Sequence, residues 1–307
     1  MTEELYKRYR PKSIKELVGQ DEAVVSLKKM IESNSVPHSI LLTGPAGCGK
    51  TSTARILKTV LKCGDVDFTE VNCADFRGIE MVREIRSRFT MSPMQGPCRA
   101  WLIDECAQLS SEAQNAFLKM LEDTPKTVYF FLATTHPNKL LPTIVNRCTE
   151  IRFKALSPKS MQVLLSGVLK KESKKLSEEV LDRVVEVADG SARRALVILH
   201  QIVDLEEEQQ LTSILSADTK RQAIDLARAL INPKAKWPDV VAVLKGIDED
   251  AESIRRMILG YASSILLSAN AKLHSRAYLI LTAMSGNFFD TGKPGLVASC
   301  YEIISGG

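Results

Sequence analysis

The residues best suited to chemistry are a lysine and a threonine at the end of a glycine-rich segment. Residues 44–51 read GPAGCGKT, which matches the pattern G-x-x-x-x-G-K-[ST] at every fixed position. In that pattern backbone N–H groups bind phosphate, the lysine reaches the terminal phosphates and the hydroxyl binds Mg²⁺. We therefore predict that this segment binds ATP with Mg²⁺, rather than being a glycine turn with a chance lysine. The expected nucleotide contacts are Gly44, Pro45, Ala46, Gly47, Cys48, Gly49, Lys50, Thr51 and Ser52.

A pair of acids, Asp104 and Glu105, follows the apolar run at residues 101–103. Carboxylates at the end of a parallel strand project into the crevice that holds the ligand. Asp104 is expected to bind the metal together with Thr51, and Glu105 to orient and deprotonate an attacking water. An acidic pair after a strand is also typical of a helix N-terminus. Its combination with Lys50 and Thr51 favours catalysis of ATP hydrolysis.

The first half of the chain alternates short apolar runs with helical patterns, which places these residues on a sheet. Strands are predicted at residues 39–42, 67–71, 100–103, 128–133 and 151–153, and helices at residues 51–61, 78–89 and 112–122. Helices between successive strands indicate a parallel sheet with right-handed crossovers. The fold class is therefore predicted to be α/β with a five-stranded parallel sheet.

From Ser157 onward the strand signals disappear. Helical patterns occupy residues 161–170, 178–188 and 193–205, and four or five further helices are expected beyond the acidic run at residues 206–208. Ser157 followed by Pro158 fits a helix start. We predict three domains: an α/β nucleotide-binding domain at 1–156, a small helical domain at 157–207 and an all-helical domain at 208–307.

Composition excludes several classes of protein. The 307 residues carry a net charge of only +4, which by itself does not establish nucleic-acid binding. The seven cysteines are scattered without a CxxC pair, so neither a disulfide framework nor a zinc site is expected. The first residues lack an apolar signal segment, and the apolar runs are too short to span a membrane. These features predict an intracellular, cytoplasmic protein.

Taken together, these segments resemble those of the AAA+ ATPase subunits of sliding-clamp loaders. The resemblance is to the bacterial gamma/tau subunit and to the small subunits of replication factor C, and it covers residues 5–205. It implies an AAA+ P-loop module, a helical lid and a C-terminal helical collar. The motifs that carry it are Tyr9-Arg10-Pro11 followed by Val18-Gly19-Gln20, Asp104-Glu105-Cys106-Ala107, Asn146-Arg147-Cys148 in place of Ser-Arg-Cys, and Gly190-Ser191-Ala192-Arg193.

The resemblance implies further roles in ATP chemistry. Thr135 stands at the position of the first polar sensor, and Arg193 is expected to contact the γ-phosphate from the lid. Arg147 would act as an arginine finger on the ATP of a neighbouring subunit, the alternative being a surface arginine after a helix. The adjacent Arg194 leaves the register of Arg193 open. The residues expected to wrap the adenine are Tyr9, Arg10, Pro11 and Val18.

The resemblance also implies partners: a sliding clamp, primer–template DNA and other loader subunits in a pentamer-like ring. The DNA contacts expected are Arg83, Arg86 and Lys119, which would bind phosphates without sequence readout; solvated helix faces are the alternative. A region near Ser92–Gly96 is expected to contact the clamp, and Met91 and Met94 in this stretch suit a partner surface, although they also suit buried packing.

Two departures from gamma/tau subunits stand out. The four-cysteine zinc module is missing after Cys63, and the chain ends at Gly307 without a tau-type extension. They suggest a phage or minimal replisome in a bacterial host. Two other functions remain open: another AAA+ DNA motor such as a branch-migration helicase, and a nucleotide-gated structural subunit without turnover.

Overall fold

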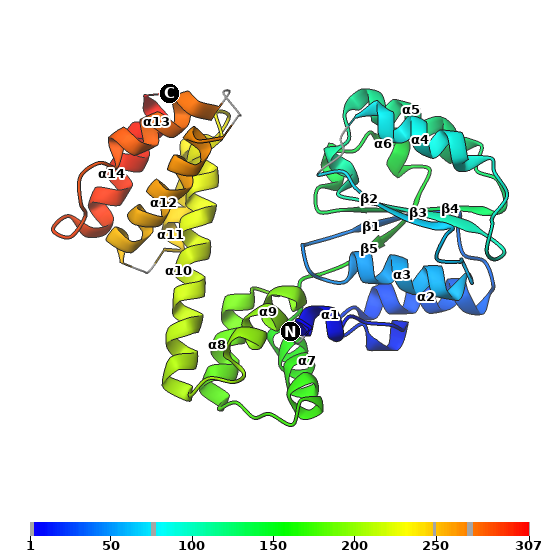
Figure 1. Cartoon of the computed structure of the whole chain (residues 1–307), viewed down its shortest axis with the longest axis horizontal. Helices are drawn as coiled ribbons and strands as arrows, with labels where there is room; N and C mark the ends of the chain where they lie inside the picture. Colours follow the sequence, from blue (N-terminus) through cyan, green and yellow to red (C-terminus); the bar gives the residue numbers. More distant parts are fainter. Residues whose placement is uncertain (1–2, 75–77, 248–249, 269–272, 307) are drawn as a thin grey trace. The chain divides into compact units, whose positions relative to one another are not determined.

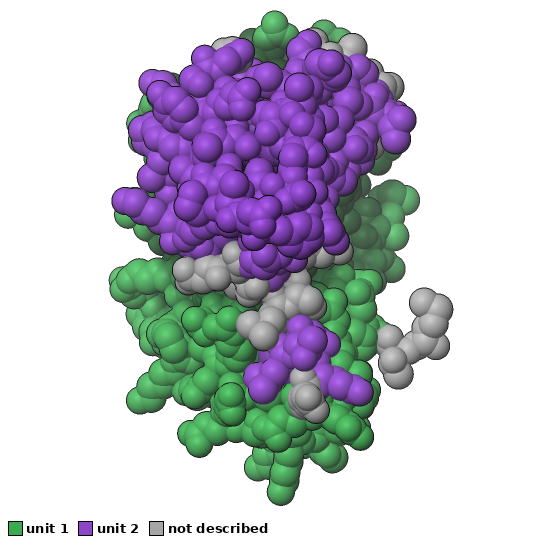
Figure 2. All heavy atoms as spheres, turned by 90° about the vertical axis from the view of Figure 1, so that its left-hand side faces the viewer, with its two compact units in different colours: residues 1–207 green, residues 208–307 purple. Residues whose placement is uncertain are grey.

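The structure, a computed structural model, describes residues 3–74, 78–247, 250–268 and 273–306. The chain divides into two compact units, Met1–Glu207 and Glu208–Gly307, which are coloured separately in Figure 2 and are described one at a time. The first unit contains both the sheet and the helices between Pro158 and Ile202. The division into three domains stays a prediction.

A five-stranded parallel sheet forms the centre of the first unit. Its spatial order is β2-β3-β4-β1-β5, and every pairing is parallel, as expected. The sheet places the end of β1 between the ends of β4 and β5, and the end of β3 lies one strand farther, beyond β4. The strands are β1 Ser39–Thr43, β2 Phe68–Asn72, β3 Arg99–Asp104, β4 Val128–Thr134 and β5 Thr149–Arg152.

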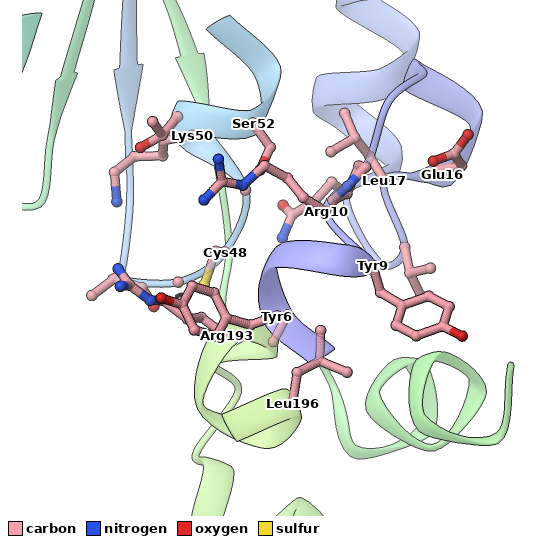
Figure 3. Close-up of a pocket in the computed structure, with 18 of the residues that line it drawn as sticks. Tyr6, Tyr9, Arg10, Glu16, Leu17, Cys48, Lys50, Ser52, Arg193 and Leu196 are labelled. Carbon is pink, nitrogen blue, oxygen red and sulfur yellow. Dashed lines mark hydrogen bonds between the residues drawn. The ribbon is translucent and has the colours of Figure 1, made fainter. Parts of the chain in front are cut away.

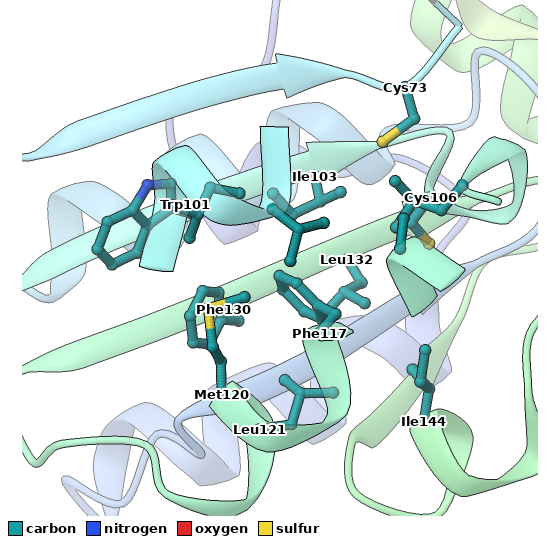
Figure 4. Close-up of a cluster of buried hydrophobic side chains, with 14 of the residues drawn as sticks. Cys73, Trp101, Ile103, Cys106, Phe117, Met120, Leu121, Phe130, Leu132 and Ile144 are labelled. Carbon is teal, nitrogen blue, oxygen red and sulfur yellow. The ribbon is translucent and has the colours of Figure 1, made fainter. Parts of the chain in front are cut away.

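Helices cover both faces of the sheet (Figure 1). One face carries α2 Asp21–Glu32 and α3 Lys50–Val60, and the other carries α4 Ile79–Phe89, α5 Ser111–Glu122 and α6 Pro142–Val145. Alternate strand residues face opposite sides, so β3 and β4 present aromatic residues toward α5 (Figure 4). There Phe130 stacks on Trp101 at 5.4 Å and meets the edge of Phe117 at 5.0 Å. This buried layer holds the ends of β3 and β4 in fixed positions.

Three capped helices complete the first unit: α7 Pro158–Lys171, α8 Glu178–Ala188 and α9 Ala192–Ile202. Each begins after a serine whose hydroxyl accepts a backbone N–H of the first turn. The prediction that the third helix reaches residue 205 is wrong, because α9 ends at Ile202 while apolar residues continue beyond it. The N-terminal helix α1, Leu5–Arg8, packs against α9 and was not predicted.

The second unit is helical throughout its described residues. Its helices are α10 Glu207–Ile231, α11 Trp237–Lys245, α12 Ala251–Leu266, α13 His274–Ala283 and α14 Gly292–Ser305. The apolar faces of α12 and α13 meet in one core through Ile254, Ile258 and Ala277, together with Met284 just after α13. Among the described residues, no helix combines the length and apolarity that a membrane span requires.

Candidate nucleotide-binding site

The glycine loop connects the end of β1 to the start of α3. Gly44, Gly47 and Gly49 have φ values of 135°, 75° and 106°, a region that residues with a Cβ rarely adopt. A Cβ on Gly44 would lie 2.2 Å from the Phe153 carbonyl oxygen. The glycines therefore allow a tight backbone path whose N–H groups lead into the N-terminus of α3.

Lys50 is folded back into this loop. Its Nζ donates to the carbonyl oxygens of Gly44 and Pro45, each at 2.7 Å, and the residue is only 6% exposed. Burial lowers the pKa of the ammonium, while the nearby carboxylates of Glu105 and Asp104 oppose that shift. A buried ammonium bonded to neutral carbonyls gains from an anionic partner, because charge-assisted hydrogen bonds are the stronger kind.

Thr51 and Asp104 come together next to the lysine. The Thr51 hydroxyl donates to Asp104 Oδ2 at 2.9 Å, and the Glu105 N–H donates to Asp104 Oδ1 at 3.0 Å. The described part of the chain holds no group of three or more His, Cys, Asp or Glu side chains arranged for a metal. One hydroxyl and one carboxylate suit Mg²⁺, which is commonly bound by few protein oxygens together with phosphates and water.

Glu105 is held in an uncommon backbone conformation. Its φ of 51° and ψ of 41° lie in the left-handed region, which non-glycine residues occupy at a cost. The Thr135 hydroxyl, just after β4, donates to Glu105 Oε2 at 3.2 Å and lies 2.8 Å from His136 Nδ1. The adjacent strands β3 and β4 thus bring the two predicted residues together. His136 was not predicted.

Helix α9, which the resemblance assigns to a lid, contacts the glycine loop directly. The Arg193 backbone N–H donates to the Gly47 oxygen at 3.3 Å, and a Cβ on Gly47 would lie 2.2 Å from Ser191 Oγ. Cys48 is buried beneath the same turn, with Sγ 3.7 Å from the Gly190 oxygen, and burial raises its pKa. The turn at residues 190–191 therefore lies on the loop, and Arg193 lines the resulting cleft.

The cleft has a volume of about 380 Å³, within the range of small-molecule sites. Of the residues predicted to contact the adenine, Tyr9, Arg10, Pro11 and Val18 all line it (Figure 3). The sequence prediction missed other lining residues, whose apolar or charged character had no distinctive spacing. They include Tyr6, Leu17, Arg55, Glu70, Leu164 and Leu196.

The segment Val18-Gly19-Gln20 is hydrogen-bonded to the segment that joins β5 to α7. The Gln20 side chain donates to the Lys154 oxygen at 2.8 Å and accepts from the Lys154 N–H at 3.0 Å. Gly19 approaches α7 so closely that a Cβ would lie 2.9 Å from Ser160 Cβ. One side of the cleft is therefore held by the Gln20 side-chain amide, which pairs with the Lys154 backbone through two hydrogen bonds.

Arg147 lies apart from these residues, just beyond α6 and outside the residues that line the cleft. Its Nη1 donates to the Thr143 oxygen at 3.0 Å, and its Nη2 forms an ion pair with Glu122 on α5. The two side chains are 36% and 46% exposed. The structure thus brings together the predicted cleft residues but leaves Arg147 on the surface.

The predicted DNA residues Arg83, Arg86 and Lys119 are exposed on α4 and α5. Met91 and Met94 are 55% and 78% exposed, so the alternative of buried packing for them is wrong. A buried carboxylate fixes their loop.

That carboxylate belongs to Asp67. It accepts the Met94 and Gln95 N–H groups and pairs with Arg99 at 2.9 Å. Although burial opposes it, these donors lower the pKa of Asp67.

Comparison with known proteins places the chain among replication proteins. The sequence family described as "DNA polymerase III, delta subunit" matches residues 74–157, and the family described as "Rad17 P-loop domain" matches residues 1–96. A replication factor C small subunit of Archaeoglobus fulgidus is 31% identical over 262 residues, covering 84% of this chain and 79% of that protein. The DNA polymerase III subunit gamma of Buchnera aphidicola is 30% identical over 257 residues, covering 76% of this chain and 71% of that protein.

Other relatives are longer. The DNA polymerase III subunit gamma/tau of Mycobacterium tuberculosis is 33% identical over 222 residues, which cover 65% of this chain and 38% of that protein. The match thus spans less than half of that relative. Among solved structures, the Thermotoga maritima RuvB Holliday junction branch migration motor superposes with a TM-score of 0.57 at 16% identity, covering 90% of this chain and 91% of the other. At that identity the likeness concerns the fold alone.

Proposed function

Because the chain belongs to the family of clamp-loader AAA+ ATPases, which includes replication factor C small subunits and the gamma subunits of DNA polymerase III, we propose that it hydrolyses ATP as a subunit of a sliding-clamp loader. The observation that carries the proposal is that five predicted residues line one cleft, Thr135 hydrogen-bonds one of them from outside that lining, and Arg147 lies on the surface. Lys50, Thr51, Asp104, Glu105 and Arg193 line the cleft. Arg147 does not.

On this proposal the cleft residues divide the work on ATP. The loop N–H groups and Lys50 bind the phosphates, and Arg193 adds a second cation from the lid. Glu105 orients the attacking water and accepts its proton, while Thr135 holds the carboxylate through the hydrogen bond at 3.2 Å. The Glu105 backbone has the left-handed conformation, with φ 51° and ψ 41°.

Thr51 and Asp104 are the residues that would hold Mg²⁺. The 2.9 Å contact between their oxygens brings two hard ligands to one point. When bound, Mg²⁺ neutralises charge on the terminal phosphates. The protein's own part is to fix both oxygens, one through α3 and one through β3, before the nucleotide arrives.

Arg147 would complete the site of a neighbouring subunit. A guanidinium at the surface, away from the cleft of its own chain, suits a role in stabilising negative charge on the ATP of a neighbouring subunit. The helices at residues 208–307 would form the collar of a ring, and residues 157–207 the lid. Arg83, Arg86 and Lys119 would contact the phosphates of primer–template DNA, and the loop with Met91 and Met94 would contact the clamp, in the cytoplasm of a bacterial host.

The test is the ATPase rate of the purified chain with its loader partners, measured alone, with clamp, with primed DNA and with both. We expect clamp and primed DNA together to stimulate hydrolysis most, with the stimulation falling steeply as salt rises. Absence of stimulation by the pair would rule out the loader assignment.

The same samples distinguish the other candidate functions. Strand displacement by a closed hexamer would indicate a DNA motor instead. Nucleotide binding without hydrolysis in a single-turnover experiment would indicate a nucleotide-gated structural subunit.

A further inference from the structure

The N-terminal helix α1 is attached to the lid through two of its residues. Arg8 Nη1 donates to the Glu172 carboxylate oxygens at 2.9 and 3.0 Å, and the Tyr9 hydroxyl hydrogen-bonds the same carboxylate. Glu172 is the C-cap residue, directly after the last residue of α7. Leu5 is 1% exposed where α1 packs against α9. The short helix therefore belongs structurally with the lid helices, although it precedes the sheet in sequence.

Tyr6, one turn before Tyr9, faces the opposite way (Figure 3). Its ring lies in the cleft, and the Arg193 guanidinium carbon is 4.9 Å from the ring centroid. That separation is within the range of a cation–π contact. Lys7 also approaches the ring, at 5.5 Å, but its ammonium is paired with Glu4 at 2.8 Å. The ring of Tyr6 thus contacts the Arg193 side chain inside the cleft.

We propose that Tyr6 is a positioning residue for Arg193. The ring holds the guanidinium beside the glycine loop, to which the Arg193 backbone is already tied through the Gly47 oxygen. A free arginine side chain loses rotamer freedom when it binds a phosphate, and a contact that restricts it beforehand reduces that loss. The N-terminal helix and the lid then act on the nucleotide as one element.

The inference rests on the proposed function, in which Arg193 contacts the nucleotide. The competing explanation is that Tyr6 contacts the adenine directly, as an aromatic ring in a nucleotide cleft is able to do. The two differ in whether the effect of Tyr6 requires Arg193. A double-mutant cycle separates them, because coupled residues are non-additive.

The experiment measures binding of a fluorescent ATP analogue and single-turnover hydrolysis by the full chain. The variants are Tyr6→Phe, Tyr6→Leu, Arg193→Ala and the double variant Tyr6→Leu/Arg193→Ala. Leucine keeps apolar bulk but removes the ring. We expect Tyr6→Leu to weaken ATP binding about two- to fivefold, the size of a partly exposed cation–π contact. Tyr6→Phe keeps the ring face and should restore the affinity.

In the Arg193→Ala background, Tyr6→Leu should have no further effect. An equal loss in both backgrounds would show that Tyr6 acts on the nucleotide or on the fold, and would overturn the inference. A loss in Tyr6→Phe as large as in Tyr6→Leu would overturn it too. If wild-type chain binds no ATP analogue, the proposed function itself fails; if Arg193→Ala weakens binding while Tyr6→Leu does not, only the positioning role fails.

Discussion

The cleft and the surface around Arg147 differ in how their polar side chains are held. In the cleft, Lys50 is buried and bonded to two loop carbonyls, and Thr51 and Asp104 bind each other. Arg147 is more than a third exposed and is paired with an acid that is exposed as well. Buried partners are expensive to separate, whereas exposed ion pairs exchange partners readily.

That difference assigns the two regions to different steps. The cleft gathers its groups within one chain, although Lys50 has to exchange its two carbonyl partners for phosphate. An exposed arginine whose two terminal nitrogens are both engaged has to leave its present contacts before it reaches a phosphate. On the proposed function, we expect nucleotide binding to be a property of the chain and rapid hydrolysis to be a property of the assembly.

Among the variants that test this contrast, Arg147→Ala is expected to have the largest effect on the rate of ATP hydrolysis. Loss of an arginine finger lowers the hydrolysis rate about 10³–10⁵-fold. ATP affinity of the isolated chain should not change, since Arg147 does not line the cleft. The measurements are nucleotide titration of the chain and the ATPase rate of the loader with clamp and primed DNA.

A mixing experiment controls for misfolding. Arg147→Ala chains have an intact cleft, and Lys50→Ala chains have an intact Arg147. An assembly with adjacent copies of the two variants should regain hydrolysis at the mixed sites. Loss of ATP affinity in Arg147→Ala, or failure of mixing to restore any rate, would contradict action on a neighbour.

Glu105→Gln is the matching test inside the cleft. The amide oxygen still accepts the Thr135 hydroxyl but does not take a proton, so hydrolysis should fall about 10²–10⁴-fold while ATP binding persists. Asp104→Asn serves as the comparison, because it should raise the Mg²⁺ concentration that hydrolysis requires. Equal rates for Glu105→Gln and wild type in a single turnover would remove Glu105 as the base.

Gly47→Ala tests whether the lid has to lie on the loop. Its φ of 75° disfavours a residue with a Cβ, and the added methyl group would displace Ser191 Oγ, 2.2 Å away, and press on Arg193 Cβ, 3.1 Å away. We expect ATP affinity to fall about tenfold, as a left-handed alanine alone costs 1–2 kcal/mol. Gly167→Ala in α7 is the control, because nothing lies within 4 Å of its added carbon. Unchanged affinity in Gly47→Ala would show that the lid contact is dispensable.

The sequence was sufficient to predict those parts of the cleft whose chemistry requires several residues next to one another along the chain. The loop at residues 44–51 and the acids at 104 and 105 follow apolar strands, and the parallel sheet brings their ends together. The predicted sheet is confirmed. The roles of the individual residues and the three-domain division stay predictions.

Contacts between segments that are far apart along the chain could not be predicted from the sequence, because the spacing of residue types does not indicate which segments pack together. The ring of Tyr6 meets Arg193, and Ser191 meets Gly47, only once α1 and the lid have packed. The predicted end of α9 lies past its actual end at Ile202, because the apolar residues Val203 and Leu205 continue its helical spacing beyond the last turn. The exposure of Met94 depends on the buried Asp67, whose carboxylate fixes the loop backbone.

Glu122→Gln has the smallest expected effect and addresses what holds Arg147. If the Glu122 carboxylate holds Arg147 in the free chain, removal of its charge should let the Arg147 guanidinium leave this ion pair more easily. Hydrolysis by the assembly without DNA should then rise. An exposed ion pair contributes little, so the increase should not exceed about fivefold. Glu112→Gln, at the exposed start of the same helix, should leave the rate unchanged. A lower rate in Glu122→Gln would instead mean that Glu122 orients Arg147 toward the neighbouring site, which would make the surface as preorganised as the cleft.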